Sequence, residues 1–245
     1  MTYCGIDLAW KTKRERTAIA ILNRNGEYQE SFICTTDQEI EDIVSSLGKE
    51  IHLGIDASLI VENLVGKRLC ETALARDGIK AIPSNLNNFN KYYHGVRGVV
   101  LVKKLCPLGF QLIDRYCPGL SRTIIEVFPH ASWKRLFPLF SRAFKKGTNA
   151  EKRDGLEQAF QLLQRIVSYY TLNYSIYTLY NLQPARKIDF SVARDLIRST
   201  DLLDAAIAAY TTFLFHSSGG KACQVYGNIA EGGFVIVPRA ASFPG

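Results

Sequence analysis

The feature that most constrains the fold of this chain is a carboxylate inside a short hydrophobic run, which occurs three times. Asp7, Asp56 and Glu126 stand in the stretches GIDL, GIDA and IIEV, each beside aliphatic residues. A buried carboxylate without a partner costs several kcal/mol, so each acid needs a base, hydrogen-bond donors or a metal ion beside it. Because Gly5 and Gly54 stand two positions before two of these acids, where another backbone must approach closely, we interpret the three acids as parts of one site.

The start of the chain predicts an antiparallel meander followed by a helix and a fourth strand. Apolar and β-branched runs indicate strands over 3–9, 17–22 and 28–34. The sequence NRNG supplies the turn between the second and the third. Helical spacing after Thr36 indicates a helix that ends near Gly48, and 51–57 is the next strand. A strand reached through a helical crossover usually runs parallel to its predecessor, so we expect the order β-β-β-α-β.

The rest of the chain alternates between helical and strand patterns, with no repeat or linker that divides it. Apolar spacing of three and four predicts helices over 64–75, 99–116, 131–136, 151–170, 189–197 and 202–215. Short apolar runs predict strands over 79–82, 123–128, 222–226 and 233–237. The polar stretch 84–93 indicates an exposed loop, and we expect a single domain over 1–245.

A fourth carboxylate comes from the start of the last predicted helix. Asp201 and Asp204 are three residues apart and therefore share one helical face. Asp204 is followed by several alanines, which are small enough to let this helix lie close against a sheet. An alternative is that Ser199 or Thr200 caps the helix and that both acids only complement its dipole. We select Asp204 as the site residue, with Asp201 as its rival.

Carboxylates from neighbouring strands and from a packed helix are what a metal-dependent phosphoryl-transfer site needs. Oxygen ligands suit Mg²⁺ or Mn²⁺, and two such ions about 4 Å apart activate water and stabilise the leaving oxygen. We therefore predict one catalytic and metal-binding set, to which Asp201 is added as a further ligand: Asp7, Asp56, Glu126 and Asp204. An acid/base pair of the glycosidase kind is an alternative, but it does not require an acid from each of four elements.

The charge of the chain favours a polyanionic partner. The formal net charge is +7 and the sequence pI is about 9.1. Two basic clusters are the candidate contacts to nucleic acid, although such a cluster is more often only a solvated face: Lys11, Lys13, Arg14, Lys145, Lys146 and Arg153. Trp10 and Trp133 each follow a strand-borne acid, so both are candidates for the rim of the site, where an aromatic ring can stack a base. Core or rim packing is the commoner role of a tryptophan.

The composition excludes several classes of protein. Hydrophobic residues make up 47% and charged residues 22% of the chain, which excludes a disordered or fibrous protein. The six cysteines form no CxxC pair and show no metal-type spacing, so we expect neither a zinc site nor a disulfide framework. The apolar runs fall far short of the roughly 20 residues needed to span a bilayer, so we expect a cytoplasmic protein without membrane contact.

A series of motifs follows in order along nearly the whole chain. They are GIDLAW at 5–10, GIDASL at 54–59, EVFPHASW at 126–133, EKRDGLEQAF at 151–160, DLLDAAIAAYTT at 201–212 and GNIAEGGFVIVP at 227–238. In these motifs the chain resembles the family known as domain of unknown function 429, usually described as predicted RNase H-like nucleases. The resemblance implies the same four acids and an RNase H-like α/β fold. That fold is a mixed sheet with the core order β-β-β-α-β-α, flanked by helices on both faces, here with helical insertions around 84–118 and 131–200.

The leading hypothesis is a metal-dependent nuclease or phosphodiesterase acting on DNA or RNA. A non-catalytic nucleic-acid-binding module is the first alternative. An ATP-dependent phosphotransferase of the actin and sugar-kinase type, which also begins with Gly-x-Asp, is the second, although 10–16 has no glycine for a phosphate loop. His130 stands where the resembled family often has a second acid, and we interpret it as a structural variant or an aid to proton transfer.

Overall fold

The centre of the protein is a six-stranded mixed sheet with the strand order β3-β2-β1-β4-β6-β5. The computed structural model describes residues 1–11, 16–140, 147–166 and 193–240. The strands of this sheet are β1 (Thr2–Asp7), β2 (Thr17–Asn23), β3 (Tyr28–Cys34), β4 (Ile51–Asp56), β5 (Gln111–Leu112) and β6 (Arg122–Glu126). β1, β2 and β3 are antiparallel neighbours, whereas β4 and β6 continue parallel to β1. The predicted meander and the parallel fourth strand are therefore confirmed.

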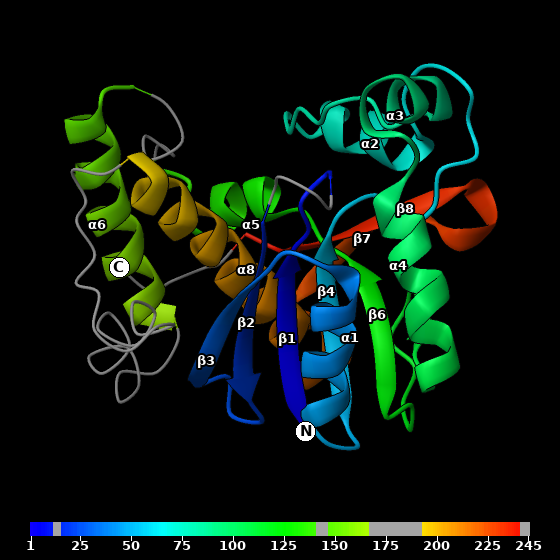
Figure 1. Cartoon of the computed structure of the whole chain (residues 1–245), viewed down its shortest axis with the longest axis horizontal. Helices are drawn as coiled ribbons and strands as arrows, with labels where there is room; N and C mark the ends of the chain where they lie inside the picture. The colour runs from blue at the N-terminus through cyan, green and yellow to red at the C-terminus, as the bar shows by residue number, and fades with distance from the viewer. Residues whose placement is uncertain (12–15, 141–146, 167–192, 241–245) are drawn as a thin grey trace.

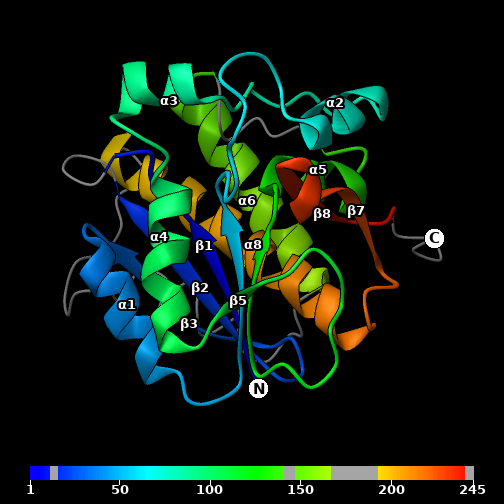
Figure 2. The same cartoon turned by 90° about the vertical axis from the view of Figure 1, so that its right-hand side faces the viewer.

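Helices cover both faces of the sheet and the ends of its strands. The helices are α1 (Asp37–Ser46), α2 (Leu69–Arg76), α3 (Leu86–Tyr93), α4 (Arg97–Leu105), α5 (Pro129–Leu136), α6 (Asn149–Ile166) and α8 (Ala193–Ser217). In Figure 1, α1 and α4 lie in front of the sheet and α8 lies behind it. Both Figure 1 and Figure 2 show α2 and α3 above the ends of the central strands. A hairpin of β7 (Cys223–Asn228) and β8 (Gly233–Pro238) follows α8, as the sequence predicts.

The short connecting elements around α2 and α3 differ from the sequence-based predictions. The stretch 84–93 is not an exposed loop, because it contains α3, whose first turn is capped by the side chain of Asn85 and which buries Phe89. The stretch 79–82 is not a strand: Ile79 closes α2 by donating to the carbonyl of Leu74, and Ile82 is 75% exposed. The predicted helix over 64–75 begins only at Leu69.

α8 packs backbone against backbone on the two central strands. A Cβ added at Gly5 would overlap the carbonyl oxygen of Ala205 and the amide nitrogen of Ala209. A Cβ added at Gly54 would overlap the hydroxyl of Thr212. The expected close approach of another backbone at these two glycines is therefore confirmed.

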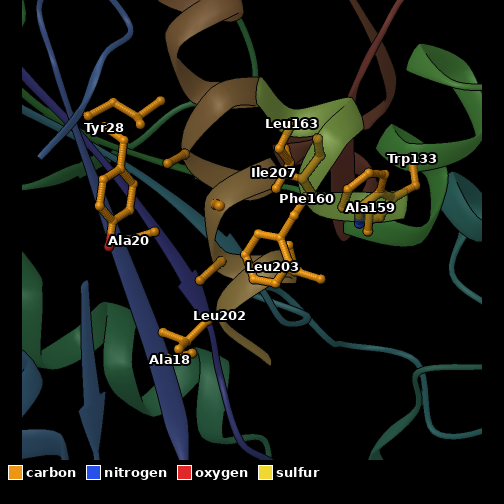
Figure 3. Close-up of a cluster of buried hydrophobic side chains, with 14 of the residues drawn as sticks. Ala18, Ala20, Tyr28, Trp133, Ala159, Phe160, Leu163, Leu202, Leu203 and Ile207 are labelled. Atoms are coloured by element: carbon orange, nitrogen blue, oxygen red, sulfur yellow. The ribbon is translucent and has the colours of Figure 1, made fainter. Parts of the chain in front are cut away.

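The core on the α8 side of the sheet joins three helices to the meander. Figure 3 shows Phe160 and Leu163 of α6 beside Leu203 and Ile207 of α8, with Trp133 of α5 next to them. The alanines of α8 bring the helix close to β1 and β2, while the larger side chains reach α6. α8 thus packs on the sheet with one side and on α6 with another, as expected for a helix that is buried nearly all round.

Gly5 sets how closely α8 can lie on the sheet. We expect Gly5→Ala to destabilise the protein by about 3 kcal/mol, because the new methyl group meets backbone atoms that cannot move independently. Gly54→Ala should cost less, since its nearest neighbour is the Thr212 side chain, which can rotate. Chemical denaturation followed by circular dichroism measures both. Equal tolerance of the two substitutions would contradict this account of the packing.

Two stacked histidines lie buried at the amino-terminal end of the sheet. The rings of His52 and His216 lie 3.7 Å apart, and the hydroxyl of Thr123 contacts a ring nitrogen of each. Burial lowers the pKa of His52 to about 4, and burial together with its neighbour lowers the pKa of His216 to about 3. The folded protein therefore keeps both rings neutral where the unfolded chain, with an ordinary histidine pKa of 6.5, takes up protons.

This difference predicts a loss of stability in mild acid. The contribution is fully present above pH 6.5 and falls as the pH drops toward 4. One pKa unit corresponds to about 1.4 kcal/mol, so we expect the unfolding free energy near pH 5 to be about 2 to 4 kcal/mol below its value near pH 7.5. Urea unfolding at both pH values measures it. A His52→Gln/His216→Gln double variant should flatten the dependence, whereas exposed His94→Asn should leave it unchanged.

Candidate functional site

A pocket of about 470 Å³ opens at the carboxyl ends of the central parallel strands. Its walls come from the last residues of β1, β4 and β6, from α2 and α3, and from the start of α4. Ligands of open α/β sheets usually bind in this position, outside the carboxyl ends of the strands. The volume is typical of a pocket for a small molecule or for one unit of a polymer.

Asp7 and Asp56 lie next to each other in this pocket. They are register partners on the parallel strands β1 and β4, whose axes are about 4.8 Å apart. Both are half-buried, and both lie on the face of the sheet that Gly5 and Gly54 present to α8, because alternate residues of a strand share a face. The two acids predicted from the GID motifs thus come together as expected.

Asp204 lies on α8 at about the level of this pair, and Asp201 lies about one turn further toward the start of the helix. Later residues of α8 lie beside earlier residues of the strands, since His216 stacks on His52 whereas Ala208 packs at Gly5 and Gly54. One turn back along the helix, about 5.4 Å, leads from Ala208 to Asp204. Two residues forward along each strand, about 6.6 Å, lead from the glycines to Asp7 and Asp56.

The surroundings of Asp204 differ from the expected start of a helix. α8 begins at Ala193, so Asp201 and Asp204 stand inside the helix, and Ser199 and Thr200 do not cap it. The buried carboxylate of Asp204 accepts a hydrogen bond of 3.0 Å from the indole nitrogen of Trp133. Asp204 is not among the described residues that line the pocket. Trp133 is 1% exposed, so its candidate place at the rim is wrong and it belongs to the core.

Glu126 lines the same pocket, but its side chain lies on the face of the sheet opposite to that of Asp7 and Asp56. Its register partner is Ile55, which belongs to the core on the α1 and α4 side of the sheet. Only 3% exposed, Glu126 accepts two hydrogen bonds from Arg68, at 2.6 and 3.0 Å, and a third from the amide of Leu59. A buried acid in an apolar strand needs a partner, and here that partner is a base.

Arg68 organises one wall of the pocket. Besides Glu126, its guanidinium contacts Glu71 at 2.9 Å and the carbonyl of Ile60 at 3.0 Å. Glu71 in turn accepts from the amide of Ser84, which connects α2 to the segment that leads into α3. Burial opposes the charge of Arg68, but the facing carboxylate of Glu126 raises the pKa of Arg68 above its ordinary value. The arginine therefore stays charged and holds β6, α2 and α3 together.

The candidate nucleic-acid contacts fall into three groups. Trp10 lines the pocket and is 42% exposed, with exposed Lys11 beside it. Arg153 is exposed on α6 and does not line the pocket. The remaining four lie outside the described residues: Lys13, Arg14, Lys145 and Lys146.

The comparisons with known proteins agree with the motifs. The model of the family described as "Protein of unknown function (DUF429)" matches residues 5–231. The chain belongs to this family. No curated protein and no solved structure matches the chain. The resemblance seen in the sequence is thereby confirmed as far as the family is concerned, and all the acids discussed above lie within the matched residues of this DUF429 protein.

The donor set in the pocket can be compared with the needs of a metal ion. Within the described ranges there is no group of three or more His, Cys, Asp and Glu side chains placed to hold one. Mg²⁺ needs fewer than three protein ligands, because it usually keeps several waters and binds through one or two carboxylates together with substrate phosphates. Asp7 and Asp56 are such a pair, so the residues present fit this ion. In the same part of the chain, no helix is both long and apolar enough to cross a membrane.

Two important pocket residues are missing from the sequence-based set. Arg68 and Arg97 both line the pocket. Arg97 donates to Asp37 at 2.7 Å and to the carbonyl of Ala9, and so fixes the segment that follows β1. The signal that could have led to Arg68 is Glu126 itself, because a buried strand carboxylate predicts a base. Nothing in the sequence shows which of the 30 basic residues that is.

The ion pair of Arg68 and Glu126 should be essential to folding. We expect Arg68→Met to destabilise the protein by about 3 to 5 kcal/mol, because it leaves a buried carboxylate unpaired. The double variant Arg68→Met/Glu126→Gln should regain part of that loss. Arg135→Met, which breaks a partly exposed pair with Asp77, is the control and should cost at most about 1 kcal/mol. Additive effects in denaturation experiments would rule out the proposed coupling.

Proposed function

We propose that this protein is a divalent-metal-dependent phosphodiesterase that hydrolyses nucleic acid. The observation that carries the proposal is the side-by-side position of Asp7 and Asp56 at the carboxyl ends of two parallel strands, in one pocket. Two neighbouring carboxylates at the end of a sheet bring together hard oxygen donors, which is the chemistry that Mg²⁺ or Mn²⁺ requires. The net charge of +7 is consistent with a polyanionic substrate.

We also infer that the sheet is of the RNase H-like type. The support for it is the antiparallel meander β1-β2-β3, followed through α1 by β4 next to β1. β6 then extends the parallel part beyond β4. The stretches between β4 and β6 and between α5 and α8 would be the insertions expected around 84–118 and 131–200. Fold by itself does not decide function, so the proposal rests on the site.

The acids take unequal parts in the proposed reaction. Asp7 and Asp56 would hold the ion, and Asp204 stands on α8 at their level. When bound, the metal would make water a better nucleophile and offset charge on the phosphate. Hydrolysis adds water to phosphorus and breaks the bond to the leaving oxygen, which takes up a proton. His130 lines the same pocket, and in the proposal its ring is the group that moves that proton.

Glu126 has a different place in the proposal. It remains a predicted ligand, but both of its oxygens accept hydrogen bonds from Arg68 in this structure. In that state the pair shapes the pocket wall and leaves the ion to the acids on the α8 side. Exposed Lys80 at the pocket is better placed to contact a phosphate than Arg68 or Arg97, which are engaged with carboxylates.

The proposal predicts metal-dependent cleavage that needs both strand acids. We expect Asp7→Asn and Asp56→Asn each to lower kcat more than about 100-fold, because the amide keeps the shape and removes the charge that holds the ion. The measurement is cleavage of single-stranded and structured DNA and RNA in Mg²⁺ or Mn²⁺. Asp42→Asn is the matched control, since Asp42 is exposed on α1 and its bond to Gln38 survives the change.

Three outcomes separate the alternatives. Absence of cleavage for every substrate and metal would sink the proposal. Salt-dependent binding of nucleic acid in that case would favour the non-catalytic binding module. Saturable binding of ATP by calorimetry, without nucleic-acid cleavage, would favour the phosphotransferase.

A further inference from the structure

Three aromatic rings form a cluster at the pocket, here named the aromatic trio: Trp10, Phe89 and Tyr93. The rings of Trp10 and Phe89 are stacked, with centroids 5.5 Å apart and an angle of 20° between their planes. The ring of Tyr93 lies 4.8 Å from that of Trp10. Trp10 lies in the segment that follows β1, and the other two come from α3. The trio therefore connects the catalytic end of β1 to the helix above it.

Trp10 is supported from behind but remains accessible. Phe89 is 6% exposed and anchored in a small core with Val61 and Val96. Trp10, in contrast, is 42% exposed and lines the pocket together with Phe89. Exposing this much of an indole ring is unfavourable in water, whereas a ring held rigid by its neighbours can stack a planar ligand at little cost in conformational entropy.

The position of the trio relates it to the acids. Trp10 is three residues beyond Asp7, so their backbones are at most about 10 Å apart. A phosphodiester held at Asp7 and Asp56 would therefore have an adjacent base within reach of Trp10. A base inside a duplex is already stacked on its neighbours and cannot offer its face to the ring.

One lysine borders the trio, and a second lies over the neighbouring ring of Tyr92. The ammonium group of Lys11 lies 5.7 Å from the centroid of Tyr93, and that of Lys91 lies 5.0 Å from the centroid of Tyr92. Both lysines are exposed. Aromatic rings interleaved with basic side chains are the combination that binds single strands, because the rings take the bases and the lysines take the phosphates.

We propose that the aromatic trio is a seat for one unstacked base and that the substrate is a single-stranded nucleic acid. This inference rests on the proposed function, because it names the substrate class for the same pocket. The base stacks on the exposed ring of Trp10, and the adjoining phosphodiester extends toward Asp7 and Asp56.

The test measures binding separately from cleavage. Fluorescence anisotropy of a labelled oligothymidylate is recorded with the whole chain in EDTA and again in Ca²⁺. The comparison strands are an oligonucleotide of the same length with abasic sites, which keeps the phosphates, and a duplex that contains the same strand. The variants are Trp10→Ala, Trp10→Phe and Lys11→Gln. Tyr116→Ala is the control, since Tyr116 is 39% exposed and does not line the pocket.

The proposal expects the wild-type protein to bind the oligothymidylate roughly 5- to 150-fold more tightly than the abasic strand, the range for stacking one base. Trp10→Ala should remove this preference, and Trp10→Phe should retain part of it. Lys11→Gln should weaken both strands by the same factor. Tyr116→Ala should behave like the wild-type protein.

Several results would overturn the inference. They are equal affinity for the two strands, an unchanged preference in Trp10→Ala, duplex binding as tight as single-strand binding, or no binding under either condition. Cleavage that does not depend on Trp10 would also overturn it and would leave the proposed hydrolysis intact. Base-dependent binding without any metal-dependent cleavage would have the opposite meaning: it would support the base-binding site and contradict the proposed hydrolysis.

Discussion

The contact on which the rest of the structure depends is the backbone packing of α8 against β1 and β4. Gly5 and Gly54 have no side chain where α8 approaches the sheet, and the alanines of α8 let its backbone come close to these glycines. This contact fixes the position of α8 along the direction of the strands. A slip by one turn would move Asp204 away from the level of Asp7 and Asp56 while leaving the hydrophobic contacts similar in kind. The relative position of Asp204 and the two strand acids is thus a consequence of core packing.

The carboxylates at the strand ends have different surroundings on the two faces of the sheet. On one face, Glu126 is neutralised by Arg68, and this pair forms a wall that also holds α2 and the start of α3. On the other face, Asp7 and Asp56 stand side by side as register partners on β1 and β4. The same strand ends therefore combine one carboxylate that is paired with a base and two adjacent carboxylates, which are the ones assigned to the metal ion in the proposed function.

The sequence predicted well what depends on local patterns and poorly what depends on distant partners. The strands β1 to β4 follow from alternation and turn residues near each other in the chain. The two glycines also indicated close packing before its partner was known. In contrast, α3 has a polar sequence, and it forms because Asn85 caps it and Phe89 reaches a core made by other segments. Arg68 lies 58 residues from Glu126, so no local pattern could pair them. Trp133 lies in the core, the commoner place of a tryptophan, but its partners on α6 and α8 are far away in the sequence.

The GID motifs combine two residues with separate tasks. Gly5 and Gly54 serve the packing of α8, whereas Asp7 and Asp56 face the pocket. Loss of the acid would leave the scaffold able to fold, but loss of the glycine would disturb it whether or not the protein is active. If the proposed chemistry is right, a family member that lacks it should still carry both glycines. The residue two positions after each glycine would then distinguish a protein with the proposed activity from one without it.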